Sequence, residues 1–434
     1  MNDGILNRLK KISLGNWILI GMILGVIVGL FLNLFVENNF IEDVILMDNV
    51  FYLGGNIFIR LMKMLVVPLV FCSLVVGVSS ISDIHKIFTV GGRIIILYLA
   101  TSLIGIFIAF ALSSVIKPGV GINIAAISQT SNVTLNQTMT DLVLNIIPEN
   151  PLNALASSEI LPVIILGVIM GFILVKLGHQ TPTLNNLFKE LNKIMISMTG
   201  IVLKFAPFGV FCLMARTFGT LGFESIFTLA KFICCVLLGL IIQLFVVYPF
   251  ILVIFTRVNP LRFYRKFMSV MFFAFSTLSS NATIPLNMNK LEDIGVSRLV
   301  SSFTVPLGAT INKNGTIIMQ SVAVIFAAQC CGMDLGTSAL ITIIFTLIIA
   351  STSTPSVPFS GLATLTLVFT SVGLPVEIIG LLVGIDHILD SFRTAVNVAG
   401  DAICTIIVAF KNKSFDMDVF NNKKEPDKSL QDME

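Results

Sequence analysis

The stretch Gly384–Asp401, GIDHILDSFRTAVNVAGD, places ionisable side chains inside a segment that is otherwise apolar enough to lie in a membrane. On a helix that advances about 100° per residue, five of its polar side chains share one face: Asp390, Arg393, Thr394, Asn397 and Asp401. A charge at bilayer depth costs at least about 2.5–3.5 kcal/mol, so such residues normally face a cavity and mark a substrate or ion path. A simple i,i+3 ion pair between Asp390 and Arg393 is the alternative, but it leaves the other polar residues of this face unexplained.

The composition predicts a polytopic membrane protein. Of 434 residues, 56% are hydrophobic and 12% are charged, and apolar runs long enough to span a bilayer recur along nearly the whole chain. The net charge of +3 gives no support for nucleic-acid binding. The seven cysteines lack metal-ligand spacing and imply no disulfide framework. Because no catalytic triad or metal-ligand set is evident, we expect neither an enzyme nor a bound cofactor.

Basic residues orient the predicted spans. The densest basic cluster, Arg257, Arg262, Arg265 and Lys266, belongs in the cytoplasm by the positive-inside rule. Counting alternately from a cytoplasmic N-terminus places nearly all Lys and Arg of the first six spans inside. The C-terminus is then cytoplasmic as well, and residues 413–434 are polar enough to predict a disordered tail.

Two apolar segments carry a polar, helix-breaking centre. Phe267–Met288 contains STLSSNATIP at 276–285, and Leu340–Leu374 contains STSTPSVPFSG at 351–361. Each is followed by a span with polar residues at its middle. Two such units predict a pair of re-entrant hairpins in an internal inverted repeat, the arrangement expected of a secondary transporter. A kinked helix is the alternative for either tip alone.

Five stretches in order carry a family resemblance: KMLVVPLVFCSLVVGVSSIS from Lys63, the first hairpin tip, VPLGATINKNGT from Val305, STSTPSVPFSG from Ser351, and the stretch from Gly384. Over essentially its full length the chain resembles the dicarboxylate/amino acid:cation symporter family, the glutamate transporters. The resemblance implies an all-α fold of eight transmembrane helices plus two re-entrant hairpins. It also implies a homotrimer embedded in the lipid of the plasma membrane, and an elevator motion that carries part of each protomer across the bilayer.

The resemblance also divides the chain. Residues 1–255 would form mainly the scaffold that makes the subunit contacts, except for the third span at about 94–116, which would belong to the transport part. Residues 256–412 would form the transport core, with both hairpins and the last two helices.

The resemblance implies uptake of an acidic amino acid, glutamate or aspartate, driven by a sodium or proton gradient. Asp390 would receive the amino group of this small-molecule substrate, and Arg393 would hold its side-chain carboxylate in a bidentate contact. The remaining substrate-binding residues would be Thr394, Asn397, Ser280, Thr316 and the backbone at Val357. The alternatives are a C4-dicarboxylate or cystine substrate, a cation-independent exchanger, or an uncoupled channel or sensor on the same fold.

Three cation sites are implied by the resemblance, and oxygen ligands of this kind suit a hard cation. The first would comprise the Gly308 carbonyl, Asn312, Asn397 and Asp401. The second would comprise Tyr98, Thr101 and Ser102, but Asn314 stands where the family has an acidic ligand. The third would comprise Thr310, Ser351, Thr352 and Thr354, but Lys313 stands where a methionine sulfur is usual.

Lys313 is therefore a candidate for altered coupling. Its ammonium group could occupy the place of a cation, or the buried side chain could carry a proton. It could also point elsewhere and balance Asp401 or Asp390. The sequence leaves these alternatives open, and we expect reduced or altered sodium coupling.

Overall fold

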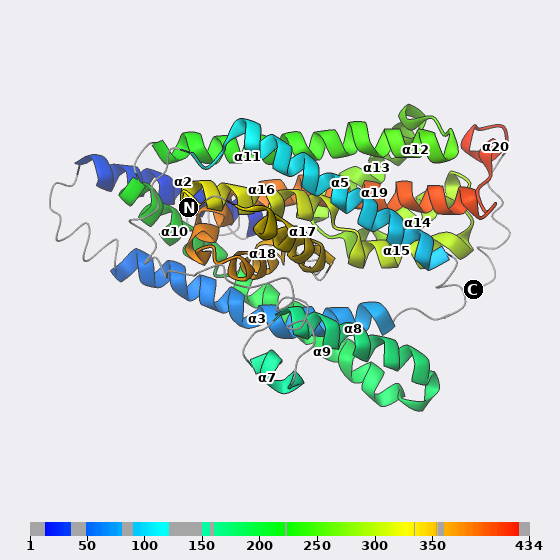
Figure 1. Cartoon of the computed structure of the whole chain (residues 1–434), viewed down its shortest axis with the longest axis horizontal. Helices are drawn as coiled ribbons and strands as arrows, with labels where there is room; N and C mark the ends of the chain where they lie inside the picture. Colours follow the sequence, from blue (N-terminus) through cyan, green and yellow to red (C-terminus); the bar gives the residue numbers. More distant parts are fainter. Residues whose placement is uncertain are drawn as a thin grey trace, which may run out of the picture.

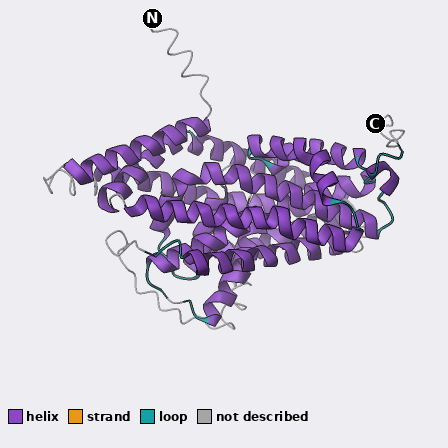
Figure 2. Ribbon diagram, turned by 90° about the horizontal axis from the view of Figure 1, so that it is seen from above, coloured by secondary structure: helices purple, strands orange, loops and turns teal. Residues whose placement is uncertain are grey.

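The computed structural model describes residues 14–35, 49–79, 90–120, 150–156, 160–221, 224–333, 335–352, 354 and 360–424. Long helices run side by side through this part of the chain, and Figure 2 draws no strand in it. One isolated β-bridge joins Val296 to Phe415. The α-helices are α2 (Leu14–Phe35), α3 (Tyr52–Ser79), α5 (Gly92–Ile116), α7 (Pro151–Ala156), α8 (Ile160–Leu177), α9 (Pro182–Leu203), α10 (Ala206–Leu221), α11 (Glu224–Ile242), α12 (Tyr248–Thr256), α13 (Pro260–Thr277), α14 (Ser280–Asp293), α15 (Arg298–Ile311), α16 (Asn314–Cys330), α17 (Thr337–Thr352), α18 (Ser360–Ser371), α19 (Ile379–Lys411) and α20 (Met417–Phe420).

Three helices in the described part of the chain are long and apolar enough to cross a membrane, namely Gly92–Ile116, Phe227–Thr256 and Ile388–Lys411. A bent pair, Pro182–Val202 with Ala206–Gly219, would add a fourth if it forms one span. These apolar helices agree with the predicted multi-pass membrane protein. The predicted total of eight spans stays a prediction.

The long helix α19 lies at the centre of the bundle. In its apolar window, Ile388–Lys411 is 89% buried, against 39% for Gly92–Ile116 and 44% for Phe227–Thr256. α19 packs against α13, α15, α16 and α12, and Figure 1 shows α16 and α19 between α11–α12 on one side and α3–α8 on the other. The outer helix α12 instead leaves Phe250 and Ile254 exposed, as suits a lipid-facing surface.

Glycines bring α2 and α10 into close contact. Gly21, Gly25 and Gly29 recur every fourth residue, so they line one face of α2. A Cβ atom added to any of them would lie within 2.3–2.5 Å of a backbone carbonyl oxygen of α10. Small residues at this spacing allow membrane helices to approach closely and gain dispersion contacts.

The first predicted hairpin tip coincides with a helix break. α13 ends at Thr277, Leu278 adopts a left-handed conformation (φ 52°), and α14 begins at Ser280. The hydroxyl of Ser279 accepts a hydrogen bond from the Ala282 N–H at 3.3 Å and so caps α14. The two helices contact each other. α17 and α18 also contact each other, but most of the second predicted tip, 353 and 355–359, lies outside the described residues.

We predicted a disordered tail from residue 413 onwards, but residues 413–424 are ordered and fold back on the helix ends. The Asp416 N–H donates to the Gly295 carbonyl at 2.8 Å, and the Lys266 ammonium donates to the Phe420 carbonyl at 2.8 Å. Val419 and Phe420 are buried. We call residues 413–424 the C-terminal strap. It joins the end of α19 to the α14–α15 turn and to α13. The predicted disorder of residues 425–434 falls outside the described part.

Asp416, the N-cap residue of α20, makes the stability of the C-terminal strap depend on pH. The Asp416 carboxylate accepts hydrogen bonds from the Val419 and Asp418 N–H groups, which hold its pKa below its usual range. Since the folded pKa is the lower one, the stabilisation is present above about pH 4 and is lost as the pH falls through the folded pKa.

We expect Asp416→Ala to cost about 0.5–2 kcal/mol at pH 7, as loss of a cap does. Amide hydrogen exchange of residues 417–420 should then be about 2- to 30-fold faster than in the native protein, with the difference shrinking towards pH 3. Asp416→Asn, which keeps a capping oxygen without the charge, should stay protected and lose this pH dependence. Equal exchange in all three proteins at pH 7 would contradict the assignment.

Candidate functional site

The predicted polar face of α19 is buried in the interior. Arg393 and Asp401 are each 1% exposed, and Asp390, Thr394 and Asn397 are buried as well. The predicted substrate residues on other helices, Ser280 at the start of α14 and Thr316 on α16, are also buried. Val357 lies outside the described residues.

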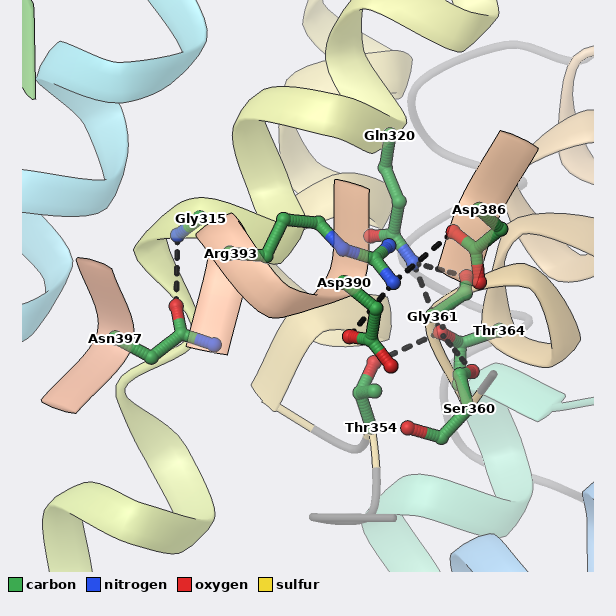
Figure 3. A network of polar contacts seen from close by, with 10 residues as sticks. All are labelled: Gly315, Gln320, Thr354, Ser360, Gly361, Thr364, Asp386, Asp390, Arg393 and Asn397. Atoms are coloured by element: carbon green, nitrogen blue, oxygen red, sulfur yellow. Dashed lines mark hydrogen bonds and ion pairs between the residues drawn. The ribbon is translucent and has the colours of Figure 1, made fainter. Parts of the chain in front are cut away.

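Arg393 is held between two carboxylates of its own helix. Its Nη2 atom lies 2.8 Å from the Asp390 carboxylate and 3.0 Å from the Asp386 carboxylate. Figure 3 shows both contacts converging on the guanidinium group. The ion pair with Asp390 that the i,i+3 spacing allowed is therefore present. The Nε and Nη1 atoms have no hydrogen-bond partner among the described residues, so this buried guanidinium keeps donors available for an anionic ligand.

Two glycines leave room for the guanidinium group and its helix. A Cβ atom at Gly361 of α18 would lie 2.6 Å from Arg393 Nη1 and 3.3 Å from Thr316 Cγ2. A Cβ atom at Gly315 of α16 would lie 2.6 Å from the Arg393 carbonyl oxygen. The Gly315 N–H also donates to Asn397 Oδ1 at 2.7 Å (Figure 3). The start of α16 and the start of α18 therefore meet at Arg393.

A hydrogen-bonded cluster supports the other side of the site. The Gln320 amide donates to the Gly361 carbonyl at 2.9 Å and to the Thr364 hydroxyl at 2.8 Å. The Thr354 and Thr364 hydroxyl groups lie 2.7 Å apart. These contacts join α16, the end of α17 and α18 next to Arg393, as Figure 3 shows.

The first predicted cation site is assembled in the structure. The Asn312 amide donates to Asp401 Oδ1 at 2.7 Å and to the Asn397 carbonyl at 3.3 Å. Gly308 lies against Asp401, because an added Cβ atom would be 2.6 Å from its carboxylate. Asn312 Oδ1 is buried without a hydrogen-bond donor among the described residues. The Asp401 carboxylate, the Asn397 carbonyl and the Asn312 amide oxygen thus belong to one buried cluster, and oxygen atoms of these kinds suit a hard cation. The Gly308 carbonyl accepts the Asn312 backbone N–H at 2.8 Å.

The second predicted cation site is assembled differently. The Ser102 hydroxyl donates to Asn314 Oδ1 at 2.7 Å, and Asn314 Nδ2 donates to Thr101 Oγ1 at 2.9 Å. Nδ2 also donates to the Tyr248 hydroxyl at 3.0 Å. The Tyr98 hydroxyl donates instead to the Thr304 carbonyl at 3.2 Å. Asn314 is thus the centre of a neutral hydrogen-bond network between α5, α12 and α16.

The third predicted cation site is not drawn together by side-chain hydrogen bonds in the described residues. The hydroxyl groups of Thr310, Ser351 and Thr352 each donate to a carbonyl of their own helix. Thr354 does the same at the end of α17, besides its contact with Thr364. Lys313, which stands between Asn312 and Asn314 in the sequence, is buried (3% exposed).

Sequence reasoning missed three partners. Asp386 precedes Arg393 by seven residues, which is two helical turns and hence the same helix face, so its spacing could have indicated it. Tyr248 and Gln320 carried no such signal. Tyr248 comes from a helix far away in sequence, and Gln320 reaches the site only because α16 crosses α18.

The fold and the site together define a membrane transporter, and comparisons with known proteins agree. The model of the sodium:dicarboxylate symporter family matches residues 14–410. The chain is 32% identical to a proton/sodium-glutamate symport protein of Geobacillus stearothermophilus, over 82% of this chain and 86% of the relative. It is 32% identical to the proton/glutamate-aspartate symporter of Escherichia coli K12, over 84% and 85% of the two chains. It is 30% identical to a C4-dicarboxylate transport protein of Laribacter hongkongensis, over 84% of each.

The chain belongs to the sodium:dicarboxylate symporter family. This family consists of transporters and is not an enzyme class, as we predicted from the lack of catalytic sets. Membership implies a small-molecule substrate and transported cations in place of a bound cofactor.

The two glycines at Arg393 yield a graded prediction. Gly361→Ala meets the Arg393 guanidinium group and, at 3.3 Å, Thr316 Cγ2, so we expect weaker substrate binding, by about tenfold or more, with a smaller loss of stability than a clash with backbone causes. Gly315→Ala meets the α19 backbone, so we expect both binding and thermal stability to fall. Substrate-binding calorimetry and thermal unfolding separate the two effects.

Gly200→Ala is the matched control, because an added Cβ atom there meets nothing within 4 Å. It should behave like the native protein in both assays. Native binding by the Gly361→Ala variant would argue that a ligand does not depend on the position of the guanidinium group.

Proposed function

We propose that this symporter takes up an acidic amino acid, glutamate or aspartate, down a cation gradient. The observation that carries the proposal is the Arg393 guanidinium, buried on the central helix between Asp386 and Asp390 with donors still available. Such a fork binds a carboxylate in a bidentate contact, and the family and its glutamate- and aspartate-symporting relatives support this substrate class.

The charge of the site favours an amino acid over a dicarboxylate. Two carboxylates face one guanidinium group, so the local charge is negative when all three are ionised. A dianion adds two like charges to this site, whereas an amino acid brings an ammonium group that Asp390 or Asp386 can accept. Thr394, Asn397, Ser280, Thr316 and Val357 would complete the substrate site. The C4-dicarboxylate alternative is favoured by the relative from Laribacter hongkongensis.

The transport cycle follows from the predicted architecture. Eight spans and two re-entrant hairpins would divide into a scaffold, mainly residues 1–255, and a transport core, 256–412 together with the third span. The core would cross the bilayer by an elevator motion within a homotrimer whose termini are cytoplasmic. The helix break at Leu278 and the contact between α17 and α18 support the hairpins.

Coupling would depend on Asp401. A cation would bind at the site formed by Gly308, Asn312, Asn397 and Asp401. This site combines a buried carboxylate with a buried amide oxygen that accepts no hydrogen bond among the described residues, and the cation would compensate the negative charge. A cation-independent exchanger, a cystine transporter, or an uncoupled channel or sensor are the alternatives. Only a coupled transporter accumulates its substrate against a gradient.

The test is uptake of labelled L-aspartate into proteoliposomes with a sodium gradient, a proton gradient or neither. We expect accumulation above the external concentration with an imposed cation gradient, and competition by L-glutamate at lower concentrations than by succinate. Arg393→Ala should reduce uptake by about 10- to 150-fold, because a hydrogen bond to a charged group is worth about 1.5–3 kcal/mol.

Arg298→Ala is the control, since this arginine is partly exposed beside Glu292 and should transport normally. Better competition by succinate than by L-glutamate would instead identify a C4-dicarboxylate transporter. Equilibration without accumulation under every gradient would identify a channel or an exchanger.

A further inference from the structure

The C-terminal strap is attached to α13 through basic side chains. The Lys266 ammonium donates to the Phe420 carbonyl at 2.8 Å and to Asn422 Oδ1 at 2.6 Å. The Arg262 guanidinium, one helical turn earlier, donates to Asn421 Oδ1. The oxygen atoms in these contacts are neutral, so the contacts position both side chains without neutralising their charge.

Within the described part of the chain, no carboxylate compensates Arg262 or Lys266. The carboxylates of the strap and of the end of α14 each lie 3.5–3.8 Å from a different cation, in the pairs Asp416–Lys424, Asp418–Lys423, Asp293–Lys290 and Glu292–Arg298. Further basic residues on the same helix ends also lack an ion pair among the described residues, namely Arg257, Arg265, Lys411 and Lys413. This end of the bundle therefore carries an excess of positive charge.

The positive charge begins where the apolar surface of the bundle ends. Phe250 and Phe255 of α12 are exposed, and α12 ends directly before Arg257. The Lys411 ammonium, at the end of α19, lies over the Phe255 ring at 4.4 Å, and Figure 1 shows the ends of α12 and α19 next to α20. In a membrane protein, basic side chains at the end of an apolar helix surface extend towards the lipid headgroups.

We propose that Arg262 and Lys266 bind the headgroup of an anionic phospholipid beside the C-terminal strap. A guanidinium group has five N–H donors, and Arg262 uses one of them in its contact with the strap, so donors remain for the oxygens of a phosphate group. Clusters of Lys and Arg next to membrane helices attract anionic lipids in the same way. The inference requires that the bundle lies in a membrane and does not depend on which substrate is transported.

The exposed surface of α12 selects a lipid over a soluble anion. The phosphate of a phospholipid stays attached to acyl chains, and these chains can lie along the exposed Phe250 and Phe255 side chains. A soluble phosphate gains the electrostatic attraction alone, whereas the lipid also removes apolar surface from water. The bound headgroup lies against α13 and residues 420–422 together, so it stabilises the strap at the point where the strap is attached.

The first test compares three probes on the native protein. Tm of the purified full-length protein in detergent micelles is measured with increasing phosphatidylglycerol, with phosphatidylcholine of the same acyl chains, or with soluble glycerol phosphate. A ligand that binds the folded state raises Tm with its concentration. We expect a rise with phosphatidylglycerol alone. An equal rise with phosphatidylcholine, or an equal rise with glycerol phosphate, would overturn the proposal, because the site would then not recognise an anionic lipid.

The second test removes the two cations. Arg262→Gln/Lys266→Gln should weaken the affinity for phosphatidylglycerol by about 25-fold, since each basic residue near an anionic surface contributes about fivefold. The matched control is Lys189→Gln/Lys193→Gln on α9, an exposed pair with the same spacing, which should keep the native affinity. An equal loss in both variants would show that the lipid responds to overall charge and would refute a site at α13.

A further variant separates the charge from the attachment of the strap. Asn421→Ala/Asn422→Gly removes both amide acceptors and keeps both cations, and glycine suits the left-handed conformation of Asn422 (φ 59°). This variant should keep the rise of Tm with phosphatidylglycerol. If it loses the rise as completely as the charge variant does, the lipid depends on the intact strap and not on the two cations, and the proposal is wrong.

Hydrogen exchange locates the lipid on the native protein. Phosphatidylglycerol should slow amide exchange of residues 417–422 relative to phosphatidylcholine, because the headgroup lies against this segment. Residues 185–195 of α9 should exchange equally fast in both lipids. Unchanged exchange in the strap together with a rise of Tm would place the lipid elsewhere on the protein and would contradict the assignment.

Discussion

The placement of charge in an apolar interior constrains the rest of this structure. An ion transferred from water to a medium of low polarity is tolerated only where partners compensate it. Arg393 is compensated by Asp386 and Asp390 on its own helix. Because the three side chains project from one face of α19, that face has to be covered by other protein segments and kept away from lipid. This requirement explains why the apolar window of α19 is the most buried of the three candidate membrane spans.

The covering segments fit because glycine occurs where backbones meet the charged helix. Gly315 brings α16 onto the α19 backbone at Arg393, and Gly361 brings α18 onto the guanidinium group. Gly400 likewise allows the Tyr248 hydroxyl to reach the α19 carbonyl of Val396, where it donates at 3.2 Å. Van der Waals contact and hydrogen bonding thus replace the water that these polar groups would otherwise need. The same segments carry the unwound residues 312–313, whose polar backbone is tolerated at this depth only inside protein.

Features that lie within a single helix or turn could be predicted from the sequence, because the spacing of polar and apolar residues reports on each element by itself. The polar face of α19 follows from the helical repeat, and the break near Leu278 follows from the run of Ser, Thr and Asn around it. Contacts between elements were not predictable in this way. The composition of the tail predicted disorder. Residues 413–424 are ordered because they bind Lys266 and Gly295, which lie more than a hundred residues earlier in the sequence. The Asn314 network joins three helices, and only the family resemblance brought Tyr98, Thr101 and Ser102 together with it in advance.

The C-terminal strap gives the end of the chain a mechanical position. Its backbone pairs with Gly295 and Ser297, while Lys266 lies over the ring of Phe420 at 5.3 Å. The last turn of α19, the start of α13 and the α14–α15 turn are therefore fastened at one point, and none of them can shift alone without breaking these bonds. Residues 413–424 therefore form a covalent and hydrogen-bonded link from the end of the helix that carries the charged site to two neighbouring parts of the bundle. A displacement of α19 along its own axis would have to break this link or carry the α14–α15 turn and α13 with it.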